Sequence, residues 1–147
     1  MAEKVSLLDV AGKATTQWYA VYMNRENPRW WNRYLKVGFQ HVQMWRPVRY
    51  GPGMRDVFWI VIEPCLEFLD AGVVFNHTPP WQYDGGVTVQ RCVAACPMQK
   101  VRDWLHIGPI TCVEMAKACL GIRSFWVRTP WQLYKYLNKR GGLLLKR

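Results

Sequence analysis

The spacing of hydrophobic side chains differs between the middle and the end of this chain, and the difference limits the folds that are open to it. Residues 37–45 read with a period of two, so that one face of the segment carries Val37, Phe39, His41, Gln43 and Trp45. A period of two is that of a β-strand. After residue 109 the period becomes helical, and one side of the segment carries Cys112, Met115, Ala116, Cys119 and Leu120. Strands followed by helices predict an α+β fold, in which an antiparallel sheet packs against a few helices.

Further strands are predicted after the first one. Residues 57–63 form a β-branched and aromatic run that Pro64 ends. Residues 46–55, between this run and the first strand, contain prolines and glycines typical of a hairpin loop, so the two segments predict an antiparallel hairpin. Shorter strand candidates lie at residues 71–75 and 87–93.

Two helices are predicted near the end of the chain. The first spans residues 112–120, and Gly121 stands where a helix commonly ends in a left-handed conformation. The second begins at Thr129, where the sequence Thr-Pro-Trp-Gln combines a capping box with proline at the first helical position. Gly141 is expected to end it.

The length of 147 residues is that of one domain with a substantial core. Half of the residues are hydrophobic and nine are tryptophan, which excludes an intrinsically disordered chain. No period of 20–50 residues recurs, so no repeat architecture is expected. We predict a lead-in of mixed helical character over residues 1–35, which packs on a single α+β domain formed by residues 36–147.

The sequence also bears on location. Glu3 and Asp9 fall where a signal peptide would need an uninterrupted apolar run, so secretion is not expected. The longest apolar run, residues 57–62, is far shorter than the roughly 20 residues of a membrane span. Five cysteines at irregular spacings do not form the pattern of a disulfide framework. We therefore expect a cytoplasmic or virion-associated protein whose cysteines are thiols and which has no membrane span.

The formal net charge of +10 gives the surface a positive potential that attracts polyanions, without choosing among them. Residues 29–34 and 123–128 set aromatic side chains among arginines, and such segments can stack on bases or sugars beside phosphate groups. Packing in the core or at an interface explains these aromatics equally well. Nucleic acid and a larger protein assembly both remain open as partners.

A metal site is a weaker hypothesis. Cys92 and Cys96 are four residues apart, and His77 and His106 are the other candidate ligands. The spacing is at the loose edge of that seen in zinc sites, and no second cysteine pair exists. The sequence therefore predicts no metal and no cofactor.

Three residues stand where the chemistry of an enzyme site would need them. His41 lies in a strand, Glu63 ends the next strand, and Cys112 opens a helix. Neighbouring strands of a hairpin could bring His41 and Glu63 into hydrogen-bond reach. A helix N-terminus favours negative charge, so it is expected to stabilise the thiolate of Cys112 and to offer amides to a developing oxyanion.

The order of these residues resembles that of a known family. The segments that carry the resemblance are Phe39-Gln40-His41-Val42-Gln43-Met44-Trp45, Phe58-Trp59-Ile60-Val61-Ile62-Glu63-Pro64 and Ile110-Thr111-Cys112-Val113-Glu114-Met115. They are similar to the circularly permuted papain-like hydrolases and acyltransferases of the NlpC type, in which the histidine strand precedes the cysteine helix. The resemblance spans roughly residues 37–137 and includes the helix start at Thr129. One position differs, because the second residue after the histidine is usually small in such proteins and is Gln43 here.

The resemblance implies a permuted papain-like fold and a role for each of the three residues. Cys112 would be the nucleophile, His41 the general base and acid, and Glu63 the carboxylate that orients His41. The expected reaction is acyl transfer through a thioester, on an amide or ester bond of a peptide or lipid, for example in a cell-wall peptide.

Each residue also has a structural interpretation. A cysteine on a buried helix face commonly behaves as a small hydrophobe, and Cys119 shares that face. A strand histidine is commonly a satisfied structural group, and Glu63 could simply end an edge strand. The alternatives to an enzyme are a non-catalytic structural or assembly protein, such as a virion or tail component, and a nucleic-acid-binding module.

Overall fold

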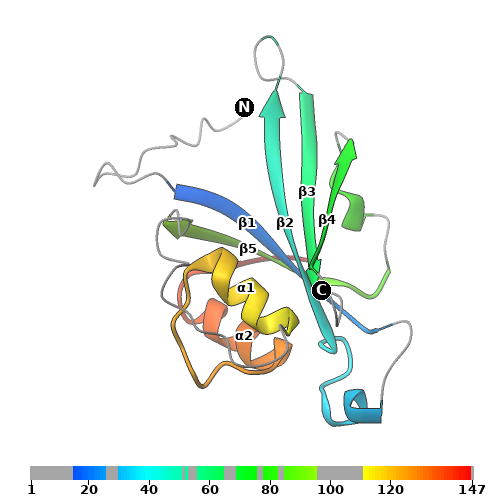
Figure 1. Cartoon of the computed structure of the whole chain (residues 1–147), viewed down its shortest axis with the longest axis vertical. Coiled ribbons are helices and arrows are strands. Elements are labelled where there is room, and N and C mark those ends of the chain that lie inside the picture. Colours follow the sequence, from blue (N-terminus) through cyan, green and yellow to red (C-terminus); the bar gives the residue numbers. More distant parts are fainter. Residues whose placement is uncertain are drawn as a thin grey trace.

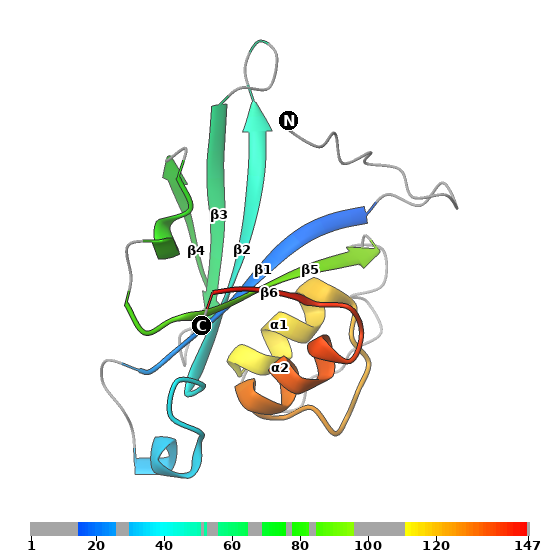
Figure 2. The same ribbon diagram turned by 180° about the vertical axis from the view of Figure 1, so that it is seen from behind.

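A computed structural model of the chain describes residues 15–25, 30–50, 52, 56–64, 69–75, 78–82, 85–95 and 111–146. The described residues form a six-stranded antiparallel sheet in the order β4-β3-β2-β1-β5-β6, and two helices pack beside it (Figures 1 and 2). The α+β class predicted from the sequence is confirmed.

The strands are β1 (Thr15–Met23), β2 (His41–Tyr50), β3 (Asp56–Pro64), β4 (Leu69–Phe75), β5 (Thr88–Ala95) and β6 (Leu143–Lys146). The α-helices are α1 (Cys112–Leu120) and α2 (Pro130–Asn138), and two short 3-10 helices are η1 (Trp30–Tyr34) and η3 (Pro80–Gln82). Among the described residues, no helix has the length and apolar character needed to cross a membrane.

The predicted hairpin is present as β2 and β3, which pair with Met44 opposite Ile62. The prediction of a loop over residues 46–55 is wrong for residues 46–50, which continue β2. Proline is tolerated at position 47 because β1 pairs with β2 only as far as Trp45, so Pro47 has a hydrogen-bonded neighbour on the β3 side alone. The strands predicted at residues 71–75 and 87–93 are confirmed as β4 and β5.

The predicted lead-in of mixed helical character is wrong for residues 15–23, which form β1. This strand lies between β2 and β5 and pairs with both, so a division at residue 35 would cut the sheet. Its side chains are apolar on both faces. Trp18, Ala20 and Tyr22 enter one buried cluster, and Val21 enters another. A strand covered on both faces lacks the apolar–polar alternation that identifies a half-exposed strand. Residues 1–14 and 26–29 lie outside the described residues.

The helix boundaries follow the predicted capping residues. Thr129 Oγ1 accepts from the Gln132 amide at 3.2 Å, and Gln132 Oε1 accepts from the Thr129 amide at 3.1 Å, which completes the capping box. Gly121 caps α1 with a φ of 66°, in the left-handed region that favours glycine. The turn after α2 passes through Gly141, whose φ is 83°.

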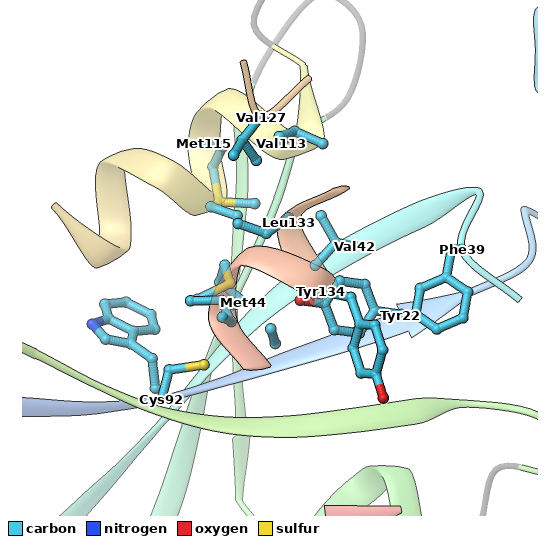
Figure 3. Close-up of a cluster of buried hydrophobic side chains, with 14 of the residues drawn as sticks. Tyr22, Phe39, Val42, Met44, Cys92, Val113, Met115, Val127, Leu133 and Tyr134 are labelled. Atoms are coloured by element: carbon cyan, nitrogen blue, oxygen red, sulfur yellow. The ribbon is translucent and has the colours of Figure 1, made fainter. Parts of the chain in front are cut away.

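The core lies between the sheet and the helices (Figure 3). Strand residues Tyr22, Val42 and Met44 face the helix residues Val113 and Leu133 there, and these five side chains are at most 1% exposed. Burial of each such side chain contributes about 1.5–3 kcal/mol. A second cluster contains Trp59, Trp81, Val87 and Val89 together with Val21, whose side chain points away from the helices. Side chains on both faces of the sheet thus fix the position of β2, which carries His41.

Candidate functional site

The fold brings the three residues singled out in the sequence to one place. His41 is the first residue of β2, Glu63 is the last but one of β3, and Cys112 is the first residue of α1. Because β2 and β3 are antiparallel, the start of one strand lies beside the end of the other. Helix α1 packs across β2, so its first residue reaches the same end of the hairpin. We call His41, Glu63 and Cys112 the thiol cluster.

The histidine and the carboxylate are hydrogen bonded. His41 Nε2 lies 2.8 Å from Glu63 Oε1, as the hairpin arrangement predicted. The second carboxylate oxygen accepts from Gln43 Nε2 at 2.7 Å, and Gln43 Oε1 in turn accepts from Trp45 Nε1 at 3.1 Å. His41, Gln43 and Trp45 alternate along β2, and this chain of bonds runs along the face that the period of two assigned to them. Both oxygens of Glu63 are therefore held in place.

The side chain of Cys112 lies near enough to the His41 ring to affect its pKa, through a hydrogen bond and through charge. Since Nε2 is bonded to Glu63, Nδ1 is the ring nitrogen left for the sulfur. Cys112 is half-buried, while His41 is 5% exposed and the Glu63 side chain is 38% exposed. The ring is thus enclosed between two groups that solvent reaches.

Opposing effects set the pKa of His41. Burial of the ring disfavours the charged form and lowers the pKa. The hydrogen bonds to Cys112 and to Glu63 raise it, as do the negative charges of these two groups, and together they outweigh burial and raise the pKa of His41 to about 9. The imidazole is therefore protonated at neutral pH.

The pKa of Glu63 shifts in the opposite direction. The hydrogen bond from His41 lowers it, partial burial raises it, and the charge of His41, the Gln43 amide and the charge of Arg25 lower it further, so that the pKa lies below its ordinary value. Glu63 is thus an anion at neutral pH. The two shifts describe one ion pair, His41 with Glu63, that is maintained around neutrality.

The other described cysteines differ from Cys112. Cys92 is buried in the core, and burial raises the pKa of its thiol to about 12. Burial also raises the pKa of Cys119 to about 11, and its sulfur lies 3.7 Å from the sulfur of Met115. Within the described residues, the hydrogen bonds of these two thiols run to the Gln90 carbonyl and to the Met115 sulfur, and not to a histidine. The interpretation of a cysteine as a small hydrophobe therefore suits Cys92 and Cys119.

The start of α1 offers amides beside the sulfur. Thr111 Oγ1 accepts from the Glu114 amide at 3.2 Å, and Thr111 O accepts from the Met115 amide at 3.0 Å. The amides of Cys112 and Val113 precede these and have no acceptor within the helix. Such amides can stabilise an oxyanion that forms next to Cys112.

The candidate zinc ligands lie mostly outside the described residues. Cys92 is described and is buried in the core, whereas Cys96, His77 and His106 are not described. Within the described residues, no group of three or more cysteine, histidine or acidic side chains is arranged to hold a metal ion.

The sequence did not reveal the contribution of Gln43, Trp45 and Arg25. Gln43 was noted only as larger than the residue usual at its position. The register of β2 with β3 places it opposite Glu63, where its length allows the bond to Oε2. That pairing was the one signal that could have identified Gln43 as a residue that orients Glu63.

No family model, curated protein or solved structure matches this chain. The geometry of the thiol cluster is therefore the evidence on which a function can be proposed.

Proposed function

We propose that this protein is a cysteine hydrolase or acyltransferase of the permuted papain-like, NlpC type, and that it acts on an amide or ester bond through Cys112. The observation that carries the proposal is the continuous chain of contacts from Glu63 through His41 to Cys112, with the His41–Glu63 bond at 2.8 Å. A nucleophile, a base bonded to it and a third group that orients the base are the arrangement on which thiol-dependent acyl transfer depends.

The charges within the cluster suit the first step. His41 has a pKa of about 9, so it carries a proton at neutral pH and stabilises the Cys112 thiolate by its positive charge. The thiolate attacks the carbonyl carbon of the substrate, and a carbon–sulfur bond forms while the carbonyl oxygen takes the negative charge. The amides of Cys112 and Val113 lie at the helix start, where they can donate to that oxygen.

The second half of the reaction uses the proton held by His41. As the tetrahedral intermediate collapses, the bond to the leaving group breaks and His41 gives its proton to the departing nitrogen or oxygen. This leaves a thioester on Cys112 and a neutral imidazole. The neutral imidazole then takes a proton from water or from an acceptor alcohol or amine, which attacks the thioester. The acid or the transferred acyl product is released, and the thiolate and the imidazolium are restored.

Glu63 and Gln43 act on His41 in this scheme rather than on the substrate. Glu63 accepts from Nε2 and directs Nδ1 towards the sulfur, and its negative charge favours the imidazolium. Gln43 fixes the second oxygen of Glu63. Both are positioning residues. The order of histidine strand before cysteine helix and the α+β arrangement further support the permuted papain-like type.

A test with an activated ester requires no knowledge of the natural substrate. Incubation of the protein with p-nitrophenyl acetate, followed by peptide mapping with mass spectrometry, should find one acetyl group on Cys112 after short times, with release of p-nitrophenol in a burst. The Cys112→Ser variant should lose the burst. The Glu63→Gln variant should slow it, whereas Asp70→Asn should not. Asp70 is a suitable control because it lies opposite Glu63 on β4 and its side chain is exposed.

Acetylation spread over several cysteines, or an unchanged burst in Cys112→Ser, would contradict the proposal. Such a result would favour the non-catalytic alternative, a structural or assembly protein in which the thiol cluster only stabilises the fold.

A further inference from the structure

A groove lies at the C-terminal end of α1, and the thiol cluster lies at the opposite end of this helix. Its volume is about 1120 Å³, and it is lined by residues of β5, of the segment that follows α1, and of the end of α2 with the start of β6. Cys112, His41 and Glu63 do not line it. Leu120 lines the groove. It lies about 12 Å from Cys112 along the axis of α1, at a rise of 1.5 Å per residue. The groove is therefore a separate feature of the surface, and we call it the arginine groove.

The charge of the arginine groove is positive. Arg91 from β5, Arg123 from the segment after α1 and Arg140 from the turn after α2 all line it. No carboxylate side chain of the described residues is among the lining groups. Arg123 and Arg140 are exposed to solvent. Three arginines from distant parts of the chain thus line one concave surface that no described carboxylate side chain lines, which favours an anionic ligand.

Aromatic rings stand beside these cations. Phe125 is 66% exposed and Trp126 is 81% exposed, although such large apolar side chains are usually at least partly covered. The Arg128 guanidinium lies 4.1 Å from the centre of the Phe125 ring and its Nε donates to the Phe125 carbonyl at 3.4 Å, which holds the loop in place. The Arg140 guanidinium lies 4.6 Å from the centre of the Tyr136 ring, which also lines the groove. The rings thus form flat apolar surfaces next to cations.

We propose that the arginine groove binds single-stranded nucleic acid. The arginines would pair with successive phosphates, and the exposed rings of Phe125 and Trp126 would stack on bases, which is how proteins bind single strands without reading their sequence. Bases that are paired in a duplex do not present their faces to such rings. An acidic peptide could pair with the arginines, but its carboxylate side chains would not stack on the exposed ring of Trp126. The volume is slightly larger than the roughly 300–1,000 Å³ of small-molecule pockets, which suits a chain-like ligand.

The test uses the full chain and a fluorescent oligo(dT) of about ten nucleotides, a length within the site sizes of known single-strand binders. Binding is followed by fluorescence anisotropy over a range of salt concentrations. The double variant Arg123→Gln with Arg140→Gln should bind about tenfold or more weakly at about 50 mM salt, and its salt slope should fall by about 1.4, or 0.7 for each lost phosphate contact. Trp126→Ala should weaken binding at least fivefold, at about 1 kcal/mol for one lost stacking contact.

The matched control is the double variant Arg49→Gln with Lys135→Gln. It removes the same charge from two exposed positions that do not line the groove, and it should bind within about twofold of the unmodified protein. The Cys112→Ser variant should bind normally, which separates this proposal from the hydrolase proposal. Circular dichroism should show the groove variants and the control variant folded, since their altered side chains are exposed.

Three results would overturn the proposal. Equal losses in the groove variant and the control variant would mean that binding depends on net charge alone. An unchanged affinity in Trp126→Ala would exclude stacking. Binding of a labelled Asp/Glu-rich peptide that depends on Arg123 and Arg140, together with no binding of oligo(dT), would assign the groove to an acidic protein partner instead.

Discussion

Replacing Glu63 with glutamine should lower the pKa of His41 from about 9 to about 8 or below, because the carboxylate 2.8 Å from the ring stabilises the imidazolium. Two unit charges at that separation attract by about 1.5 kcal/mol when screened as in bulk water and by about 6 kcal/mol at an effective dielectric constant near 20. The Glu63 side chain is 38% exposed, so the aqueous limit is the better guide. An attraction of about 1.5 kcal/mol corresponds to about one pKa unit.

The assay is a pH titration of the histidine ring signals by NMR. The chain has three histidines, and the His41→Gln variant identifies the signal that belongs to position 41. Asp70→Asn is the matched control, since it removes a carboxylate from the strand beside Glu63 and leaves the His41–Glu63 bond intact. A pKa of His41 that is ordinary in the unmodified protein, or one that Glu63→Gln and Asp70→Asn change equally, would refute the electrostatic reasoning.

Three further outcomes concern stability. Thr129→Ala should reduce the free energy of unfolding by about 1 kcal/mol in urea titrations because it removes the α2 capping box, whereas Thr129→Ser keeps the capping hydroxyl and should retain most of the stability. Gly142→Ala should destabilise by about 1–3 kcal/mol, since the added carbon would lie 2.8 Å from Gln90 Nε2, which donates to Asn138, and an effect near zero would contradict the close packing. The pKa of His41 is raised on folding, so the stabilisation by its partners is complete below pH 6.5 and is lost as the pH rises through about 9. Urea midpoints measured from pH 6 to pH 10 should therefore fall more in the unmodified protein than in His41→Gln.

Much of the fold could be predicted because local rules determine it. The Thr129 and Gly121 caps were read from residue types whose side chains or backbone freedom satisfy helix ends, and the structure uses them in that way. The β2–β3 hairpin followed from one alternating segment and one β-branched segment. Its loop was predicted too early because Pro47 was taken to end the strand, whereas only one neighbouring strand bonds to β2 there.

The missed strands have a different physical explanation. In β1 both faces are buried, so its sequence shows no alternation of apolar and polar residues, and its pairing with β2 and β5 is a property of the whole sheet. Strand β6 has only four residues, with exposed leucines on an edge strand, and so short a segment carries little signal.

Part of the candidate site could likewise be predicted from the sequence, and part could not. His41, Glu63 and Cys112 could be selected from their residue types and from the elements on which they were expected. The bond from Gln43 to Glu63 depends on strand register, and the arginine groove depends on three segments that meet only in the folded chain. Neither can be read from spacing along the sequence.

The account depends most on the contact between Cys112 and a protonated His41. Its most direct test is the rate at which iodoacetamide labels each cysteine at pH 6, resolved by peptide mapping. Since burial raises the pKa of Cys92 to about 12 and of Cys119 to about 11, both should react slowly. Cys112 should react faster than either, and His41→Ala should remove that advantage. If Cys112 reacts no faster than the buried thiols, or if its rate is the same without His41, the thiol cluster is not a reactive site.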